Sequence, residues 1–240
     1  MTMRVLHADQ QIAAARAELA ARGVPKLESA YTGYAKRIAR RLGIEPSPTV
    51  GDLIKSWDVL ETLRFLEAKV PRSAAIVDLG AYASEILLVL DTAGFTDLTG
   101  VDLNSRLTNM PAADRINYVV SDFMATGLAP DAYSAITSIS VIEHGYDPER
   151  LFAEAARLLK PEGYFIASFD YWPDKIATPG VRFFNMDWLI FSREDVEAML
   201  GVAARHGLYP VGDLMFDGKD KAIEHGGFAY TFGWLALQKR

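Results

Sequence analysis

Ala74-Ala75-Ile76-Val77-Asp78-Leu79-Gly80 is the stretch of sequence that decides the fold. It is a short apolar run that ends in a carboxylate and a glycine, and a second run, Leu98-Thr99-Gly100-Val101, ends in Asp102. In a doubly wound sheet, a tight turn after the first strand takes the charged part of a nucleoside-bearing cofactor, and a carboxylate about 20 residues further on accepts the ribose hydroxyls. The pattern therefore predicts a cofactor-dependent enzyme.

Short β-rich runs alternate with helical ones on the C-terminal side of this stretch. The sequence predicts strands over 74–79, 98–102, 116–120, 134–139 and 164–169, and helices over 84–93, 147–159 and 193–206. Such alternation implies right-handed crossovers and an α/β fold with a mainly parallel, doubly wound sheet. Two later runs, 208–216 and 228–238, predict an antiparallel hairpin at one edge of that sheet.

The N-terminal part is helical in character. Apolar residues recur at helical spacing over 11–22, 30–42 and 53–68. The second of these segments also carries a basic cluster, for which we favour a solvated helix face over an anion-binding patch; its members are Lys36, Arg37, Arg40 and Arg41.

Composition limits the classes of function. With 240 residues, half of them hydrophobic, the chain can bury one substantial core. It has no cysteine, which excludes disulfides and thiolate zinc sites. The net charge of −6 makes nucleic acid an unfavourable partner. There is no signal-peptide core and no apolar run of the roughly 20 residues that a membrane helix needs, so we expect a cytoplasmic protein without membrane insertion. No sequence feature predicts an oligomeric state.

Four segments together resemble a known family. They are 76–85 (Ile-Val-Asp-Leu-Gly-Ala-Tyr-Ala-Ser-Glu), 100–104 (Gly-Val-Asp-Leu-Asn), 121–123 (Ser-Asp-Phe), and 131–144, which ends in Glu143-His144 and is followed by Leu-Leu-Lys-Pro-Glu-Gly at 158–163. From about Trp57 onward the chain resembles the class I S-adenosylmethionine-dependent methyltransferases. The resemblance implies a Rossmann-like methyltransferase fold with a seven-stranded sheet, an N-terminal helical cap over 1–70 and a methyltransferase domain over 71–240.

The same resemblance assigns a cofactor site for S-adenosylmethionine. Asp102 would accept both ribose hydroxyls, Asp122 and Phe123 would hold the adenine, and Ser140 would lie beneath the sulfonium. The full set of implied cofactor contacts is Asp78, Gly80, Ala81, Tyr82, Asp102, Leu103, Asp122, Phe123 and Ser140.

The glycine loop departs from the family pattern. Tyr82 and Ser84 stand where the second and third glycines are usual, so either these residues adopt negative φ or the cofactor sits further out. In the first case Tyr82 would cover the methionine part of the ligand. A dehydrogenase would need more glycines near a pyrophosphate, so methyl transfer is preferred. A degenerate relative that binds no cofactor is the remaining alternative.

Proton transfer and acceptor binding are predicted beyond the fourth and fifth strands. Imidazole titrates near neutral pH, so His144 is a candidate base, with a structural role in its turn as the alternative. Asp170 is the second predicted catalytic residue. Glu143 and His144 are too few to make a metal site, and none is predicted. The aromatic and charged residues after the fifth strand are of the kind that binds a sugar ring. The alternative is that they form a lid that packs on its own apolar core. Its predicted acceptor contacts are Tyr171, Trp172, Arg182 and Trp188.

The sequence thus predicts methyl transfer to a small or glycan-like acceptor, most simply at a hydroxyl oxygen. Methylation of an amine, or of carbon on a quinone-like ring, remains open. RNA methylation and a non-catalytic binding role also remain open.

Overall fold

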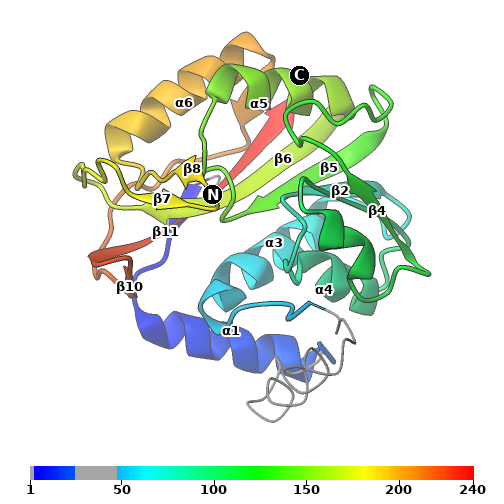
Figure 1. Ribbon diagram of the computed structural model, residues 1–240, viewed down its shortest axis with the longest axis horizontal. Helices are drawn as coiled ribbons and strands as arrows, with labels where there is room; N and C mark the ends of the chain where they lie inside the picture. The colour runs from blue at the N-terminus through cyan, green and yellow to red at the C-terminus, as the bar shows by residue number, and fades with distance from the viewer. Residues whose placement is uncertain (1–2, 25–47) are drawn as a thin grey trace.

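The computed structural model describes residues 3–24 and 48–240. Within these residues the centre of the molecule is a sheet with the strand order β1-β11-β6-β5-β2-β3-β4, in which β9 and β10 also pair with β11 (Figure 1). Five neighbouring strands run parallel, namely β4 (Ile116–Val120), β3 (Asp97–Asp102), β2 (Ala75–Leu79), β5 (Tyr133–Ile139) and β6 (Leu159–Tyr171). The five predicted parallel strands are confirmed.

The strand order reverses at β2. The chain runs from β2 to β3 and β4 on one side, and then crosses to β5 and β6 on the other side. Asp78 is opposite Gly100 of β3 and Thr137 of β5, so the carboxyl ends of the three strands meet. In open α/β sheets, ligands bind in the crevice at such a reversal. The fold therefore places the site beyond the ends of β2, β3 and β5.

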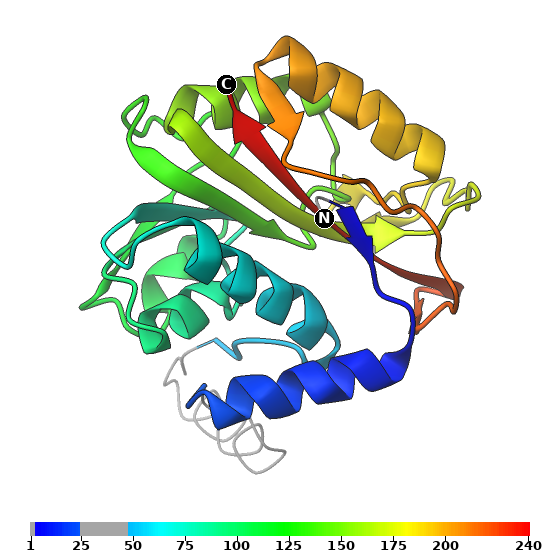
Figure 2. The same ribbon diagram turned by 180° about the vertical axis from the view of Figure 1, so that it is seen from behind.

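Helices cover both faces of the sheet. Figure 1 and Figure 2 show α1 (Asp9–Ala21), α3 (Ser56–Lys69) and α4 (Ile86–Thr92) on one face and α5 (Pro148–Leu158) and α6 (Arg193–Arg205) on the other. Each face has its own buried apolar cluster, and β2 contributes Ile76 to one cluster and Val77 to the other. A parallel strand buried on both faces reads as a continuous apolar run, which is why β2 is evident from the sequence.

The helix limits follow from local capping. The side chain of Asp147 accepts a hydrogen bond from Arg150 N at 3.1 Å at the start of α5, and Ser192 forms a capping box with Asp195 at the start of α6. The predicted helix over 53–68 begins as a 3-10 turn, η1 (Leu53–Lys55), before α3. The predicted helix over 30–42 and its basic cluster lie outside the described residues.

The predicted antiparallel pairing of the C-terminal runs is confirmed, and two further strands join it. β11 (Phe228–Lys239) does run antiparallel to β9 (Leu208–Pro210), but it also pairs with β6 and so lies inside the sheet. Its outer side takes two strands that were not predicted, β1 (Met3–Val5) and β10 (Ile223–His225). Three-residue strands are too short to show a period of two, so only pairing with β11 reveals them. Because β1 joins the sheet, the range 1–70 is not purely a helical cap.

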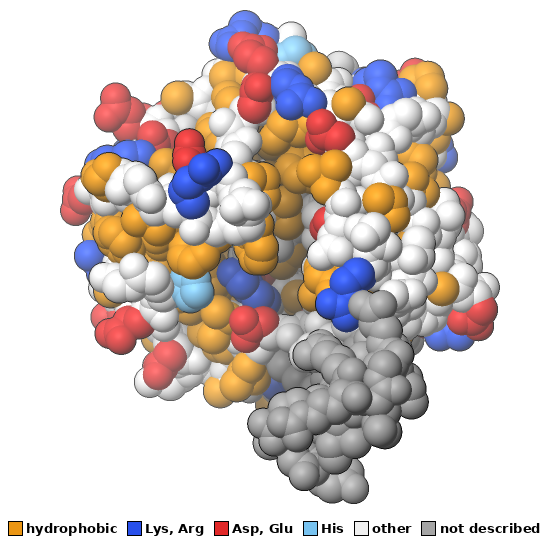
Figure 3. All heavy atoms as spheres, viewed as in Figure 1, with side chains coloured by type: hydrophobic (Ala, Val, Ile, Leu, Met, Phe, Trp, Pro, Cys, Tyr) orange, Lys and Arg blue, Asp and Glu red, His pale blue; other side chains and the backbone are white. Residues whose placement is uncertain are grey.

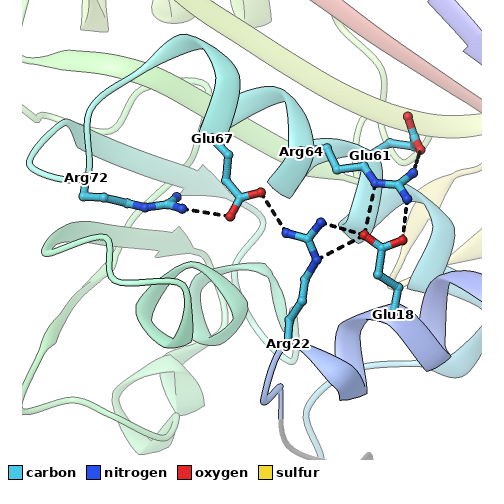
Figure 4. Close-up of polar contacts among 6 residues, drawn as sticks. All are labelled: Glu18, Arg22, Glu61, Arg64, Glu67 and Arg72. Carbon is cyan, nitrogen blue, oxygen red and sulfur yellow. Dashed lines mark hydrogen bonds and ion pairs between the residues drawn. The ribbon is translucent and has the colours of Figure 1, made fainter.

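Alternating charges connect α1 to α3 and to the turn after it (Figure 4). Arg22 donates to Glu18 at 2.6 Å and to Glu67 at 2.8 Å, and Arg72 donates to Glu67 at 2.8 Å. Arg64 pairs with Glu18 and with Glu61. Exposed pairs of this kind each contribute little, so the network orients α1 more than it stabilises it.

Candidate functional site

Gly80 makes the turn that opens the site. Its φ is +86°, and a Cβ at this position would lie 2.6 Å from Cγ1 of Val141 and nearer still to Cγ2. The amide groups of Gly80 and Ala81 both donate to the carbonyl of Val101, at 2.9 and 3.0 Å. Glycine is therefore required here for both its backbone conformation and its lack of a side chain.

The rest of the loop needs no further glycine. Tyr82 and Ser84 do not have positive φ; the residue between them, Ala83, does, at 63°. Tyr82 N donates to Asp102 Oδ2 at 3.0 Å, which turns the loop towards the end of β3. Of the two predicted alternatives, the loop adopts the one in which the tyrosine and the serine are accommodated at negative φ.

Asp102 is held ready to accept more hydrogen bonds. Its Oδ1 accepts from Asn104 N at 2.8 Å while Oδ2 accepts from Tyr82 N, so each oxygen keeps a free lone pair. The next residue, Leu103, is 62% exposed and presents an apolar surface beside the carboxylate. A carboxylate and an apolar side chain in this arrangement fit a nucleoside.

Asp122 and Phe123 follow β4. Asp122 accepts from Met124 N at 2.9 Å and from Arg150 of α5 at 2.8 Å, and its side chain is partly exposed. The ring of Phe123 is buried in the core on the α5 side of the sheet. Most of the Phe123 ring is used in packing, and its contact with adenine stays a prediction.

Asp78 lies under the loop and is almost fully buried. Its Oδ1 accepts from Thr137 Oγ1 at 2.7 Å, Ser84 also interacts with the carboxyl group, and its Oδ2 accepts no hydrogen bond within the geometric limits from residues 3–24 and 48–240. Burial, with a smaller contribution from Asp102, raises the pKa of Asp78 to about 7. A buried oxygen without a partner at a turn of this kind is a feature of a ligand site rather than of a packed core.

Three further buried carboxyl groups gather beside the ends of β5 and β6: Asp58 of α3, Glu143 and Asp170. Each has one oxygen that finds no hydrogen-bond partner in the described part of the chain. Burial raises the pKa of all three, to about 6 for Asp58, and the charge of Asp170 raises the pKa of Glu143 and of Asp58 further. The ammonium of Lys55 opposes these shifts. We call Asp58, Glu143 and Asp170 the buried acidic cluster.

Asp170 is oriented by its neighbours. Its Oδ2 accepts from the indole Nε1 of Trp188 at 2.8 Å, and Tyr230 of β11 also bonds to the carboxylate. Trp188 is itself buried. Trp188 therefore positions Asp170, and its predicted contact with the acceptor stays a prediction.

His144 lies at the turn after β5, next to the two-stranded ribbon of β7 (Arg182–Phe183) and β8 (Met186–Asp187). Its ring meets the edge of Phe184 at a centroid distance of 5.3 Å and that of Phe183 at 6.2 Å. Burial, with the Lys55 charge as a smaller cause, lowers the pKa of His144 to about 4. The imidazole is therefore neutral at physiological pH but a weak base.

The three other predicted acceptor contacts have different surroundings. Tyr171 is fully buried, and its hydroxyl donates to Phe216 O at 2.7 Å, because it points into the core on the α5 side of the sheet. Trp172 is half-buried and packs near Gly218 and Lys221. Arg182 is exposed on β7, where it pairs with Asp187 at 3.2 Å.

Sequence reasoning missed Lys55, Asp58 and Phe184. Lys55 and Asp58 gave little signal, because both sit in a stretch that reads as an ordinary amphipathic helix. Phe184 belongs to the aromatic stretch that was singled out, but the residue itself was not; it lies at the tip of the β7–β8 ribbon, 81% exposed and with φ of 53°. Figure 3 shows that this face of the molecule is hollowed near its centre, with apolar side chains along the hollow.

Two kinds of feature are not found in residues 3–24 and 48–240. No three His, Asp or Glu side chains there converge to hold a metal ion. No helix in the same ranges is long and apolar enough to cross a membrane.

The fold and this site define a nucleoside-cofactor protein of the doubly wound α/β class. Residues 77–167, from β2 into β6, match the family model described as a methyltransferase domain. None of the curated protein sequences compared with this chain matches it.

Solved structures with the same fold cover most of the chain. The [4+2]-cyclase SpnF has 12% identity and a TM-score of 0.62, over 87% of this chain and 95% of its own. A geranyl diphosphate methyltransferase in complex with S-adenosylmethionine has 14% identity and a TM-score of 0.60, over 77% and 86%. The geranyl diphosphate C-methyltransferase of Streptomyces coelicolor A3(2) has 18% identity and a TM-score of 0.56, over 80% and 86%.

Residues 77–167 thus match a methyltransferase domain, and the chain has the fold of these solved structures. One of them, the geranyl diphosphate methyltransferase, is a complex with S-adenosylmethionine. The residues at the open edge fit this group, since Gly80 leaves room over the turn and Asp102 retains two free lone pairs. The fold does not set the acceptor, because the similar structures include a cyclase as well as methyltransferases.

Proposed function

We propose that this enzyme methylates a hydroxyl oxygen of a small, polyhydroxylated or glycan-like acceptor bound beyond the ends of β5 and β6. A hydroxyl needs a base to take its proton as it attacks, and a base works best when its pKa lies near the working pH. The observation that supports the proposal is Asp170. Its Oδ2 accepts from Trp188, its Oδ1 accepts no hydrogen bond within the geometric limits from the residues that the structure describes, and burial raises the pKa of its carboxyl group.

We choose Asp170 over His144 as the proton acceptor because the pKa shifts of the two groups run in opposite directions. With a pKa of about 4, His144 takes a proton from a hydroxyl less readily than a free imidazole does. The buried carboxyl of Asp170 is shifted in the opposite direction, towards neutral pH. We therefore assign proton removal to Asp170 and a positioning role to His144, whose ring supports Phe184.

S-adenosylmethionine, when bound, supplies a methyl group already activated by a sulfonium, so the chain has to bind, orient and accept a proton. We assign the ribose hydroxyls to Asp102 and the methionyl side of the turn to Gly80, Ala81 and Tyr82. The tip of the β7–β8 ribbon forms one wall of the acceptor site. There Phe184 offers an apolar face of the kind on which the C–H face of a sugar ring packs.

The test is methyl transfer from isotope-labelled S-adenosylmethionine to a panel of polyols, glycosides, amines and phenols. The methylated atom is then identified by NMR of the product. We expect methyl ethers from the polyol and glycoside members. Label found on nitrogen or carbon would replace the hydroxyl assignment with one of the alternative acceptor classes, and transfer to none of the panel would contradict the proposal.

The role of Asp170 is tested separately with the best acceptor. Asp170→Asn keeps the shape of the side chain but removes the base, so turnover should fall at least about 100-fold while affinity for S-adenosylhomocysteine is unchanged. The matched control is Asp174→Asn, which changes an exposed carboxylate four residues further on. An Asp170→Asn enzyme that keeps its turnover and its pH profile would remove Asp170 from the mechanism.

A further inference from the structure

Lys55 ends the η1 turn at the open edge of the sheet. Its Nζ donates to Ser140 Oγ at 2.6 Å, just beyond β5, and lies 4.0 Å from the centre of the Phe232 ring. The segment that carries it also touches the glycine loop, because Gly51 N donates to Ala83 O at 2.9 Å. The ammonium is thus positioned between the loop after β2 and the end of β5.

Neighbouring contacts hold this segment in place. Ser56, the residue after Lys55, accepts from Arg16 Nε of α1 at 2.8 Å. Arg16 in turn pairs with Glu85, at the end of the glycine loop. The position of Lys55 relative to the loop is therefore set by contacts other than its own side chain.

The charge of Lys55 lacks a direct counter-ion. Within the described residues Lys55 forms no ion pair closer than 4.0 Å, whereas the nearby Arg16 has Glu85. The buried acidic cluster faces Lys55 from α3, from the turn after β5 and from β6, and the other titratable groups around it are His144, His225 and Tyr230. Burial raises the pKa of the three carboxyls, so they are ionised less fully than exposed ones and balance less of the ammonium charge.

The cofactor brings an anion. The methionyl moiety of S-adenosylmethionine carries a carboxylate beside its ammonium and sulfonium groups. The glycine loop, in which Tyr82 and Ser84 replace two glycines, leaves few backbone amides open to this carboxylate. The alternative partner for Lys55 is an anionic group on the acceptor, but the contacts to Ser140 and, through Gly51, to Ala83 place the ammonium on the cofactor side.

We propose that Lys55 binds the carboxylate of the cofactor's methionyl moiety and so positions the reacting end of the cofactor over Ser140. The inference rests on the cofactor site assigned above, and it adds a residue from outside the four motif segments. A charge-assisted hydrogen bond of this kind changes affinity by about 10- to 100-fold.

The experiment is calorimetric binding of two probes that differ in the methionyl moiety, S-adenosylhomocysteine and 5′-methylthioadenosine. The second lacks the carboxylate. Lys55→Met should weaken S-adenosylhomocysteine at least about 10-fold and leave 5′-methylthioadenosine within about 3-fold of the wild type. Lys55→Arg should restore most of the lost affinity, and Lys69→Met, at the exposed end of α3, the helix that follows η1, is the matched control.

Each outcome decides a different point. Equal losses for both probes would mean that Lys55 only supports the fold of the site, and no loss for either would mean that it does not contact the cofactor; both overturn the inference. A wild-type protein that binds neither probe would overturn the cofactor site itself. A protein that shows the expected binding pattern but methylates no hydroxyl would contradict the proposed function and leave the role of Lys55 standing.

Discussion

Substitution of Gly80 by alanine tests the turn on which the site depends. Two costs add at this position. An L-residue at φ of +86° costs about 1–2 kcal/mol relative to glycine. The added methyl also enters the space of Val141, where overpacking costs about 1–3 kcal/mol. We expect Gly80→Ala to lower the free energy of unfolding by about 2–5 kcal/mol and to weaken binding of S-adenosylhomocysteine, since the loop must shift.

Gly94 provides a matched control for the backbone cost. Its φ is +89°, nearly that of Gly80, but nothing lies within 4 Å of the position that a Cβ would take. Gly94→Ala should therefore cost only the backbone part, about 1–2 kcal/mol. The difference between the two variants isolates the steric contact with Val141.

A double-mutant cycle measures the same contact independently. Val141→Ala removes both methyl groups that a Cβ at position 80 would meet and leaves the Val141 Cβ at 3.0 Å. In that background Gly80→Ala should cost no more than Gly94→Ala, which gives a coupling energy of about 1–3 kcal/mol. The assay is urea unfolding with a common m-value. If the two alanine variants are equally stable, or if the cycle is additive, the steric argument for Gly80 is refuted.

Three further predictions concern charge. Burial raises the pKa of Asp58 from an ordinary value near 4 to about 6, so between these pH values the folded protein keeps a proton on Asp58 that the unfolded protein has lost. The free energy of unfolding should therefore fall by up to about 3 kcal/mol as pH rises from 4 to 7. Asp58→Asn should remove this fall in thermal unfolding. The pKa of Glu154 is shifted in the opposite direction, because bonds from Arg157 and Thr126 lower it to about 2. The stabilisation by Glu154 is therefore present above pH 4.5 and is lost as the pH falls from 4.5 towards 2. Glu154→Gln should cost about 1–3 kcal/mol at pH 7, with little change near pH 2. Arg22→Ala breaks the exposed network between α1 and α3 and should cost less than about 1 kcal/mol, a loss that 1 M salt largely hides; a larger, salt-insensitive loss would mean that the network is a principal support of α1.

The parallel half of the sheet could be predicted from the sequence because its signals are local. β2 is an apolar run buried on both faces and closed by a glycine, and α5 is bounded by an Asp N-cap and by Pro161 just after its end. The two carboxylates of the opening pattern are brought to one edge because parallel strands in register align their carboxyl ends. For Asp102, sequence position alone predicted a residue that the structure holds with free lone pairs at that edge.

Long-range contacts decided the rest. Trp188 and Asp170 are 18 residues apart and read as two separate acceptor-side groups, yet the indole of one holds the carboxylate of the other. Lys55 meets Ser140 across 85 residues, and Asp58 meets Ser168 across 110, so no local pattern signals either pair. β1 exists only because β11 offers it an edge. The sequence alone determined the parallel strands and the edge at which a ligand binds, since capping, periodicity and strand direction are properties of neighbouring residues. Only the tertiary structure decided which charges share that edge, because burial and the resulting pKa shifts depend on what the rest of the chain packs around each group.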